Sequence, residues 1–238
     1  GLLILAVSDF PRWGDPGSPA STYRVSNHYL TESFGETSVP NIVTAVLADY
    51  RGYDTLFETV VIFAAGIAIL AILGRRKKPE TLFCEQDKLS VPAEDLIIDT
   101  TVRLIVPVIQ LFALYVVAHG HYSPGGGFQG GIIFGSSLIL LSLARNLPYT
   151  LRRFSQSRAV LLATVGVLIY AGIGLLCLVL GSNFLDYSIL GKLLHISSIQ
   201  ARSLSIFGVE IGVGFTVATV MFIIFANLSS GGRLQDGL

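Results

Sequence analysis

Long apolar segments alternate with polar, turn-rich segments along most of the chain. Because a helix needs about 20 apolar residues to cross the hydrocarbon core of a bilayer, each apolar run predicts one membrane span. The first run has only 15 residues, so its span must also include Glu58 and reach toward Asp54. The pattern therefore predicts an all-α, polytopic integral membrane helix bundle with about five full spans. The apolar runs cover residues 59–73, 96–118, 131–144, 159–181 and about 203–228.

The stretch before the first full span has a different pattern. Residues 2–7 are apolar but too few to cross a membrane, so we expect them to be the truncated end of a span that begins further upstream. Residues 8–40 are polar and rich in turn-forming residues, which predicts an exposed linker or cap. Asn41 then offers a helix N-cap. After it, Ile42, Val46 and Tyr50 fall on one face of an amphipathic stretch.

The composition agrees with a membrane protein. Of 238 residues, 52% are hydrophobic and 13% are charged, and the mean hydropathy is +0.67. Soluble domains carry roughly 25% charged residues. A formal net charge of zero gives no indication of a nucleic-acid partner. Cys84 and Cys177 show no CxxC or histidine spacing, so the sequence predicts no disulfide, no metal site and no cofactor.

The lysines and arginines predict how the chain lies across the membrane. Residues 74–95, residues 145–158 and the C-terminus together hold ten of them, whereas the segments predicted on the other side hold four. Positively charged loops stay predominantly in the cytoplasm. We therefore expect both basic loops in the cytoplasm and the connection between the second and third spans outside.

That connection, residues 119–131, reads HGHYSPGGGFQGG and contains six glycines and one proline. An interior glycine costs a helix about 1 kcal/mol and a proline about 3 kcal/mol, so a break in regular helix is predicted. Such a break is tolerated at membrane depth only where protein or a water-filled cavity satisfies its polar groups. A plain interfacial hairpin is the alternative. The residues assigned to this structural break are Pro107, as a kink in the span before it, and Ser123, Pro124, Gly125, Gly126, Gly127, Phe128, Gln129 and Gly130.

Glu210 is the clearest candidate for ion or proton transport. An ionisable side chain at the bilayer centre costs about 3 kcal/mol or more, so such residues are functional candidates by default. Glu210 lies about seven residues into the last span. Gly214 and Ala218 share its helical face and would allow another helix to approach closely. A purely structural hydrogen bond between helices is the alternative role. His119, at the outer end of the second span, is its expected titratable neighbour.

Four further charged residues lie in or beside the predicted spans. Asp99 and Arg103 are four residues apart and are expected to pair along one helix face. Asp54 and Glu58 have the same spacing, and Arg51 lies one turn earlier to offset their repulsion. We take all four residues as candidates for the ion or proton pathway. The alternative for Asp99 and Arg103 is a structural ion pair, and the alternative for Asp54 and Glu58 is a solvated helix end.

Two stretches resemble known subunits. Residues 102–107 (VRLIVP), the histidines of HGH at 119–121 and the glycine-rich 123–131 resemble the B subunit of Mrp-type multisubunit cation/proton antiporters and its equivalent in membrane-bound hydrogenases. This resemblance covers roughly residues 96–228, including Glu210. Residues 35–56, with GET and then VPNIVTAVLADYRGYDTL, resemble the C-terminal part of the large A subunit, or the small hydrogenase subunit that corresponds to it. The chain thus looks like a fusion of two neighbouring subunits.

The resemblance implies a domain organisation and a function. Residues 1–78 would form the A-like segment, 79–95 a connector, and 96–238 a B-like four-helix membrane domain. The chain would be a non-catalytic, multi-pass subunit in a prokaryotic inner or plasma membrane. Other membrane subunits, the lipid bilayer, Na⁺ and H⁺ would be its partners. The many-helix antiporter domain of a complete A subunit is not in this sequence, which favours a complex with split subunits, such as a membrane-bound hydrogenase.

Two other classes of function compete with ion translocation. A structural scaffold that seats the ion-pumping subunits is compatible with every pattern above. A stand-alone membrane enzyme is not supported, because the sequence has no GxSxG, HExxH or comparable nucleophile motif.

Overall fold

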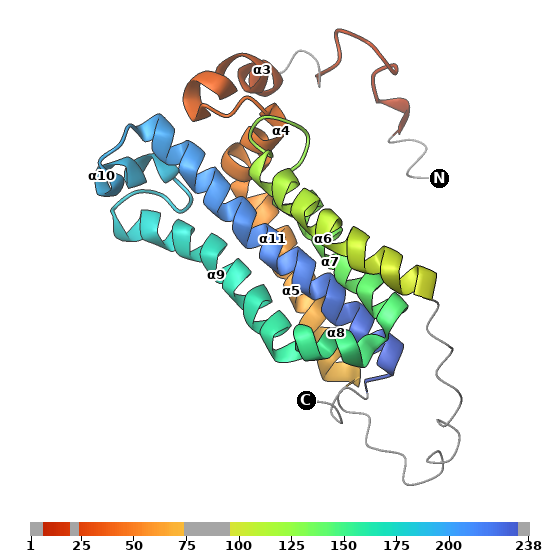
Figure 1. The fold of residues 1–238 in the computed structure, drawn as a ribbon. Coiled ribbons are helices and arrows are strands. Elements are labelled where there is room, and N and C mark those ends of the chain that lie inside the picture. The colour runs from red at the N-terminus through yellow and green to blue at the C-terminus, as the bar shows by residue number, and fades with distance from the viewer. Residues whose placement is uncertain (1–6, 20–23, 74–95, 233–238) are drawn as a thin grey trace.

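The computed structural model describes residues 7–19, 24–73 and 96–232, and the regular elements in these ranges are helices (Figure 1). Five of them are long and apolar enough to cross a membrane, which confirms the predicted all-α bundle. The proposed N-terminal span fragment at residues 2–7 and the connector at 79–95 lie almost entirely outside the described residues. The five long helices are α5 (Gly52–Leu73), α6 (Leu96–Ala118), α7 (Gly127–Arg145), α9 (Gln156–Val179) and α11 (Ser198–Ser230).

Helix α11 is the centre of the bundle. In its most apolar stretch 72% of the residues are buried, against 17–39% in the four other long helices. Figure 1 shows α11 running between α9, α5 and α7. Small residues bring the backbones together: a Cβ on Gly166 of α9 would lie 2.4 Å from the Gly212 carbonyl oxygen of α11. Close approach through small residues is a common way for membrane helices to associate.

The ends of several helices differ from the expected boundaries. Helix α7 begins at Gly127, so residues 127–130 form its first turn and are not part of the break. The basic loop contains a short helix, α8 (Leu147–Arg153). Helix α11 begins at Ser198, because Ser197 and Gln200 form a reciprocal capping box that satisfies the first backbone donors.

The polar N-terminal stretch is also more ordered than a linker. Residues Arg24–Thr37 form α3, which lies over one end of the bundle (Figure 1). Asn41 caps α4 (Ile42–Ala45) through a hydrogen bond from the Val43 amide, which confirms the predicted N-cap. The expected amphipathic helix does not continue regularly, because residues Val46–Tyr50 form a π-helix, η1, before α5 starts. Helices of this kind often mark functional sites.

Two buried tyrosines join this N-terminal part to the rest of the bundle. The connection between α9 and α11 contains the 3₁₀-helix η2 (Tyr187–Ile189) and the short α10 (Leu190–Leu194). The Tyr187 hydroxyl donates a hydrogen bond to the Ala48 carbonyl oxygen at 3.1 Å, and Tyr170 of α9 donates to that of Gly52 at 2.8 Å. Ala48 lies within η1 and Gly52 is the first residue of α5, so the two tyrosines bind on either side of the interruption between these helices.

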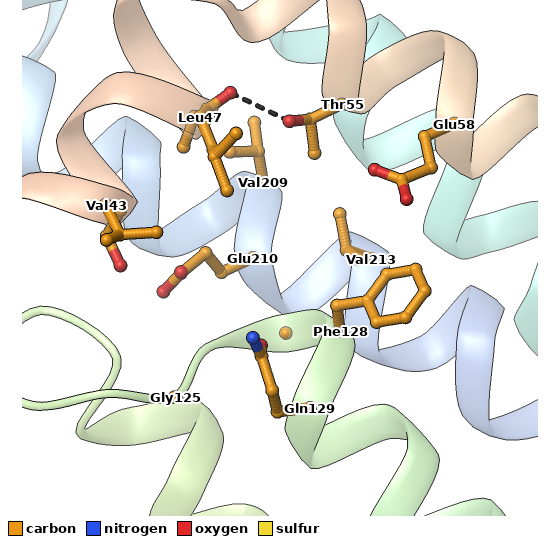
Figure 2. Close-up of a pocket in the computed structure, with 13 residues that line it drawn as sticks. Val43, Leu47, Thr55, Glu58, Gly125, Phe128, Gln129, Val209, Glu210 and Val213 are labelled. Atoms are coloured by element: carbon orange, nitrogen blue, oxygen red, sulfur yellow. Dashed lines mark hydrogen bonds between the residues drawn. The ribbon is translucent and has the colours of Figure 1, made fainter. Parts of the chain in front are cut away.

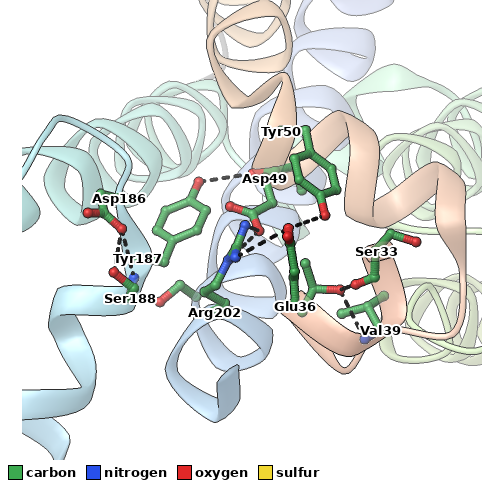
Figure 3. A network of polar contacts seen from close by, with 12 residues as sticks. Ser33, Glu36, Val39, Asp49, Tyr50, Asp186, Tyr187, Ser188 and Arg202 are labelled. Atoms are coloured by element: carbon green, nitrogen blue, oxygen red, sulfur yellow. Dashed lines mark hydrogen bonds and ion pairs between the residues drawn. The ribbon is translucent and has the colours of Figure 1, made fainter. Parts of the chain in front are cut away.

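An ionic network at the same end holds α3 (Figure 3). Arg202 of α11 pairs with Asp49 at 2.6 Å and with Glu36 of α3 at 3.8 Å. The Tyr50 hydroxyl donates to Glu36, and this hydrogen bond is the main reason why the pKa of Glu36 lies below its usual value. Burial raises the pKa of Asp49, and Arg202 offsets part of that rise. Segments far apart in the chain are therefore linked through their charges.

Candidate functional site

The glycine-rich stretch packs directly against Glu210. A Cβ on Gly120 would lie 2.9 Å from one Glu210 carboxylate oxygen, and a Cβ on Gly126 would lie 2.6 Å from the other. A Cβ on Gly127 would lie 2.0 Å from the Glu210 carbonyl oxygen. Gly126 also has φ +122°, a conformation that residues with a side chain rarely adopt. The glycines therefore form a close-fitting backbone wall around one buried carboxyl group.

The break itself is held by the N-terminal segment. The Asn41 side chain donates hydrogen bonds to the carbonyl oxygens of Gly120 at 2.8 Å and Ser123 at 2.9 Å. Thr44 donates to the same Gly120 oxygen at 2.8 Å. These bonds satisfy backbone groups that no regular helix satisfies. The residues that order the break lie mainly outside it.

His121 is the histidine that faces Glu210. Its Nδ1 lies 3.8 Å from a Glu210 carboxylate oxygen, and its Nε2 lies 3.0 Å from the Ser203 carbonyl oxygen. Both residues are 8% exposed. Within the described part of the chain, this Nδ1 and this carboxylate oxygen have no hydrogen-bond partner. Two buried polar atoms of complementary chemistry thus face one another without a direct hydrogen bond.

The prediction that His119 is the titratable neighbour of Glu210 was wrong. Its ring stacks on Tyr115 of α6 at a centroid distance of 4.3 Å and lies 6.1 Å from the ring of Tyr122. His119 directly follows the end of α6, whereas the chain turns at Gly120 and brings His121 to face Glu210. The tight turn after α6 therefore separates the two histidine side chains. A two-residue spacing in a turn gives no indication from sequence of which side chain points inward.

A cavity of about 220 Å³ lies beside Glu210 (Figure 2). It is large enough for several water molecules. Thr44, Thr55 and Gln129 contribute polar groups to its wall, and Val209, Val213 and Phe128 contribute apolar surface. Glu58 of α5 lines the same cavity, so the two carboxylates share one space. Asp54 is half exposed and pairs with Arg51 away from it.

A second charged cluster lies at the opposite end of the bundle. Asp99 and Arg103 pair at 3.0 Å along α6, which confirms the predicted ion pair. Arg145 at the end of α7 also binds both oxygens of Asp99. The Arg145 side chain is 14% exposed, whereas that of Arg103 is 64% exposed. The stronger partner of Asp99 is therefore on another helix, where sequence spacing could not reveal it. Pro107 lies inside α6, as predicted.

Among residues 7–19, 24–73 and 96–232 there is no group of three histidine, cysteine, aspartate or glutamate side chains that would hold a metal ion. Cys177 is a buried free thiol. The chemistry available at the Glu210 site is therefore that of a carboxyl, an imidazole, hydroxyls and a small cavity with both polar and apolar walls.

Comparison with known families accounts for most of the chain. The family model described as "Domain related to MnhB subunit of Na+/H+ antiporter" matches residues 97–223, which is 127 of 238 residues. The family model MbhE, described as the E subunit of MBH, matches residues 18–88. A protein of Staphylococcus aureus (strain Newman) named "Putative antiporter subunit mnhB2" is 31% identical over 138 residues, covering 58% of this chain and 96% of that protein.

Two solved structures extend the likeness. A chain of the membrane-bound sulfane sulfur reductase (MBS), an archaeal respiratory membrane complex, is 29% identical with a TM-score of 0.67, covering 95% of this chain and 91% of that chain. A chain of the Mrp complex from Dietzia sp. DQ12-45-1b is 27% identical with a TM-score of 0.59, covering 83% of this chain but 22% of that one. These matches confirm the resemblance read from the sequence motifs, and the chain belongs to the family of domains related to the MnhB subunit of Na⁺/H⁺ antiporters.

Proposed function

We propose that this chain is a membrane subunit of an Mrp-type cation/proton antiporter module and contributes to ion translocation within a multisubunit complex. The observation that carries the proposal is the buried, unsatisfied pair of His121 Nδ1 and Glu210, whose glutamate also lines a cavity. Buried ionisable groups in membrane helices are costly and mark ion or proton pathways. The relatives named as antiporter subunits support the same conclusion.

The geometry suggests how a proton would move. A backbone carbonyl only accepts hydrogen bonds, so the contact with Ser203 requires a proton on His121 Nε2. In the neutral imidazole, the lone pair of Nδ1 then faces the Glu210 carboxyl. A separation of 3.8 Å is too long for direct transfer. One bridging water or a small shift of either side chain would connect the two groups.

Glu58 offers the continuation of this path. It lines the far side of the cavity and lies on the exposed surface of α5, where it would meet either a partner subunit or the membrane interface. Water in the cavity would join it to Glu210. The same carboxylate and hydroxyl oxygens suit a dehydrated Na⁺ ion, which makes Na⁺ the second candidate for the ion that this path carries.

The setting we propose is a respiratory complex with split subunits, such as a membrane-bound hydrogenase or a related machine. The sulfane sulfur reductase chain is matched almost from end to end, whereas the Dietzia chain is much longer than this one. In this proposal residues 1–78 and 96–238 are the two fused subunit-like parts, joined by 79–95. The complex lies in a prokaryotic plasma membrane with its basic loops in the cytoplasm.

Glu210→Gln is the decisive variant, because it keeps size and hydrogen bonding but removes the charge. In the purified complex reconstituted into liposomes, we expect normal assembly and strongly reduced Na⁺-driven proton movement, with partial recovery in Glu210→Asp. Glu32→Gln on the exposed face of α3 is the matched control and should behave as the wild type.

Two results would contradict the proposal. Full exchange activity in Glu210→Gln would remove Glu210 from the ion pathway. Loss of assembly together with activity, in both the Gln and the Asp variants, would show that Glu210 serves packing and that the chain is a scaffold.

A further inference from the structure

A basic groove opens between α6, α7 and α8, at the end of the bundle opposite the Glu210 site. Two adjoining cavities of about 660 and 430 Å³ share Arg103, Arg145 and Tyr149 in their walls. Arg153 lines the larger cavity and Arg152 the smaller one. Four arginines from three helices therefore surround one space on the surface of a membrane protein.

The charge in this groove is not balanced within the described residues. Asp99 is the one carboxylate there that contacts these arginines, and it is fully engaged by Arg145 and Arg103. The four arginines carry four positive charges and Asp99 neutralises one of them, so three positive charges remain in the groove. Arg152 and Arg153 are exposed, and neither forms an ion pair with an acidic residue in the part of the chain that the structure describes. The groove therefore suits a ligand with negative charge.

An aromatic ring fixes the arrangement of the arginines. The Tyr149 ring has the Arg145 guanidinium 4.7 Å and the Arg153 guanidinium 5.5 Å from its centroid. Cation–π contacts of this kind hold guanidinium groups in place. Tyrosine is also enriched where a membrane protein meets the lipid headgroups. An arginine cluster ordered around a tyrosine is therefore suited to a lipid headgroup.

The groove continues into apolar surface. The larger cavity is also lined by Val102, Val106 and Leu141. Leu138 is common to it and to a separate, almost wholly apolar cavity of about 460 Å³ between α6, α7 and α11. An inorganic anion would use only the arginines. A molecule with a phosphate and a long hydrocarbon chain would use both parts.

We propose that this groove binds an anionic phospholipid, with its phosphate among Arg103, Arg152 and Arg153 and one acyl chain along Val106, Leu138 and Leu141. Basic pockets between membrane helices bind anionic headgroups by the same electrostatic attraction. The proposal does not depend on the role of Glu210, because it concerns the other end of the bundle.

The test uses the intact complex after delipidation in mild detergent. Dioleoylphosphatidylglycerol or dioleoylphosphatidylcholine is added back, and bound lipid is counted by native mass spectrometry. The wild type should retain phosphatidylglycerol selectively. Arg152→Gln/Arg153→Gln should bind it about 25-fold more weakly, since each basic residue near an anionic surface contributes about fivefold. Binding of phosphatidylcholine should not change.

Two further variants keep the test specific. Arg158→Gln removes a charge from the same end of the bundle but lies outside the groove wall, touching α8 through a hydrogen bond to the Arg153 carbonyl. It should retain wild-type binding. Leu141→Trp fills the apolar part without changing charge and should also weaken phosphatidylglycerol binding.

Several outcomes would overturn the proposal. Equal retention of the two lipids by the wild type would do so, as would displacement of phosphatidylglycerol by millimolar inorganic phosphate. So would undiminished phosphatidylglycerol binding in the double variant or in Leu141→Trp. A loss of phosphatidylglycerol binding in Arg158→Gln as large as in the double variant would also contradict it. Absence of bound lipid, combined with loss of a neighbouring subunit in the double variant, would assign the groove to a protein partner instead.

Discussion

Gly127 and Glu210 meet backbone to backbone, so that a Cβ on Gly127 would lie 2.0 Å from the Glu210 carbonyl oxygen. This contact joins the first turn of α7 to the central helix α11 at the point where the buried carboxyl group lies. It explains why a glycine-rich sequence is needed here even where the backbone is helical. The position of Glu210 relative to the break depends on this absence of a side chain.

Gly127→Ala is therefore expected to destabilise the protein. The added methyl group meets a backbone atom that cannot move without shifting α11, and overpacking of this kind costs about 1–3 kcal/mol. The midpoint of thermal unfolding in detergent should fall. Gly172→Ala is the matched control, because nothing lies within 4 Å of its added Cβ in α9. Equal midpoints for the two variants would contradict the packing described.

The two histidines of the break should differ in their effect on transport. His121→Gln removes the imidazole that faces Glu210 and should lower exchange roughly 10²-fold, the lower end of what a positioned proton carrier supplies. His119→Gln removes a ring that stacks on Tyr115 and should leave the rate close to that of the wild type. Proton movement in liposomes containing the assembled complex measures both. A larger loss in His119→Gln would reverse the assignment.

Much of the architecture could be predicted because hydropathy reports burial in a bilayer directly. The extent of α6 and the inclusion of Glu58 in α5 followed from span length alone. The N-cap at Asn41 followed from local hydrogen-bonding chemistry. Helix α3 was missed because it is short and mostly polar, and its large apolar residues Val25, Leu30 and Phe34 are exposed. It is held by contacts of Glu36 with Tyr50 and Arg202, which lie outside the helix.

The site was predictable in its centre but not in its surroundings. A lone glutamate in an apolar span is conspicuous, so Glu210 could be singled out from the sequence, and the structure shows it buried. His121 reaches the site only through the fold of the turn after α6. Asn41 and Thr44 lie on a segment some 80 residues earlier in the chain, as the hydrogen bond from Asn41 to Ser123 illustrates. The helical start of α7 was missed because glycine disfavours helix on average, whereas here close packing against α11 outweighs that preference.

The ion pair between Asp99 and Arg145 should contribute more to stability than the ion pair between Asp99 and Arg103. Asp99→Asn leaves the half-buried Arg145 without its carboxylate, and an unpaired charge in such a position is destabilising. Arg103→Gln removes an exposed partner and should change little. Thermal unfolding of the purified complex should therefore show a clear fall for Asp99→Asn and a small one for Arg103→Gln. Because Asp99→Asn breaks both pairs, a fall for Arg103→Gln as large as that for Asp99→Asn would show that the pair within α6 is the stronger one.

The attachment of α3 should weaken in acid, because it depends on ionised Glu36. The hydrogen bond from Tyr50 is the largest influence that lowers the pKa of Glu36 below its ordinary 4.5, and the charges of His28 and Arg202 act in the same direction. A lowered pKa means that the stabilisation is fully present above pH 4.5 and is lost as the pH falls through the lower folded value. Asp49 responds in the opposite sense, because burial raises its pKa.

Hydrogen-exchange protection factors, which are corrected for the intrinsic pH dependence of exchange, measure this attachment. Protection of residues 24–37 should be constant from pH 7 to about 5 and fall at lower pH, while the η1 segment around Asp49 loses less. Tyr50→Phe should lower the protection of α3 at neutral pH and flatten its pH dependence, since the donor to Glu36 is gone. Tyr29→Phe keeps the ring contact with Tyr50 and serves as the control. Unchanged protection of α3 in Tyr50→Phe would mean that packing alone holds this helix against the bundle.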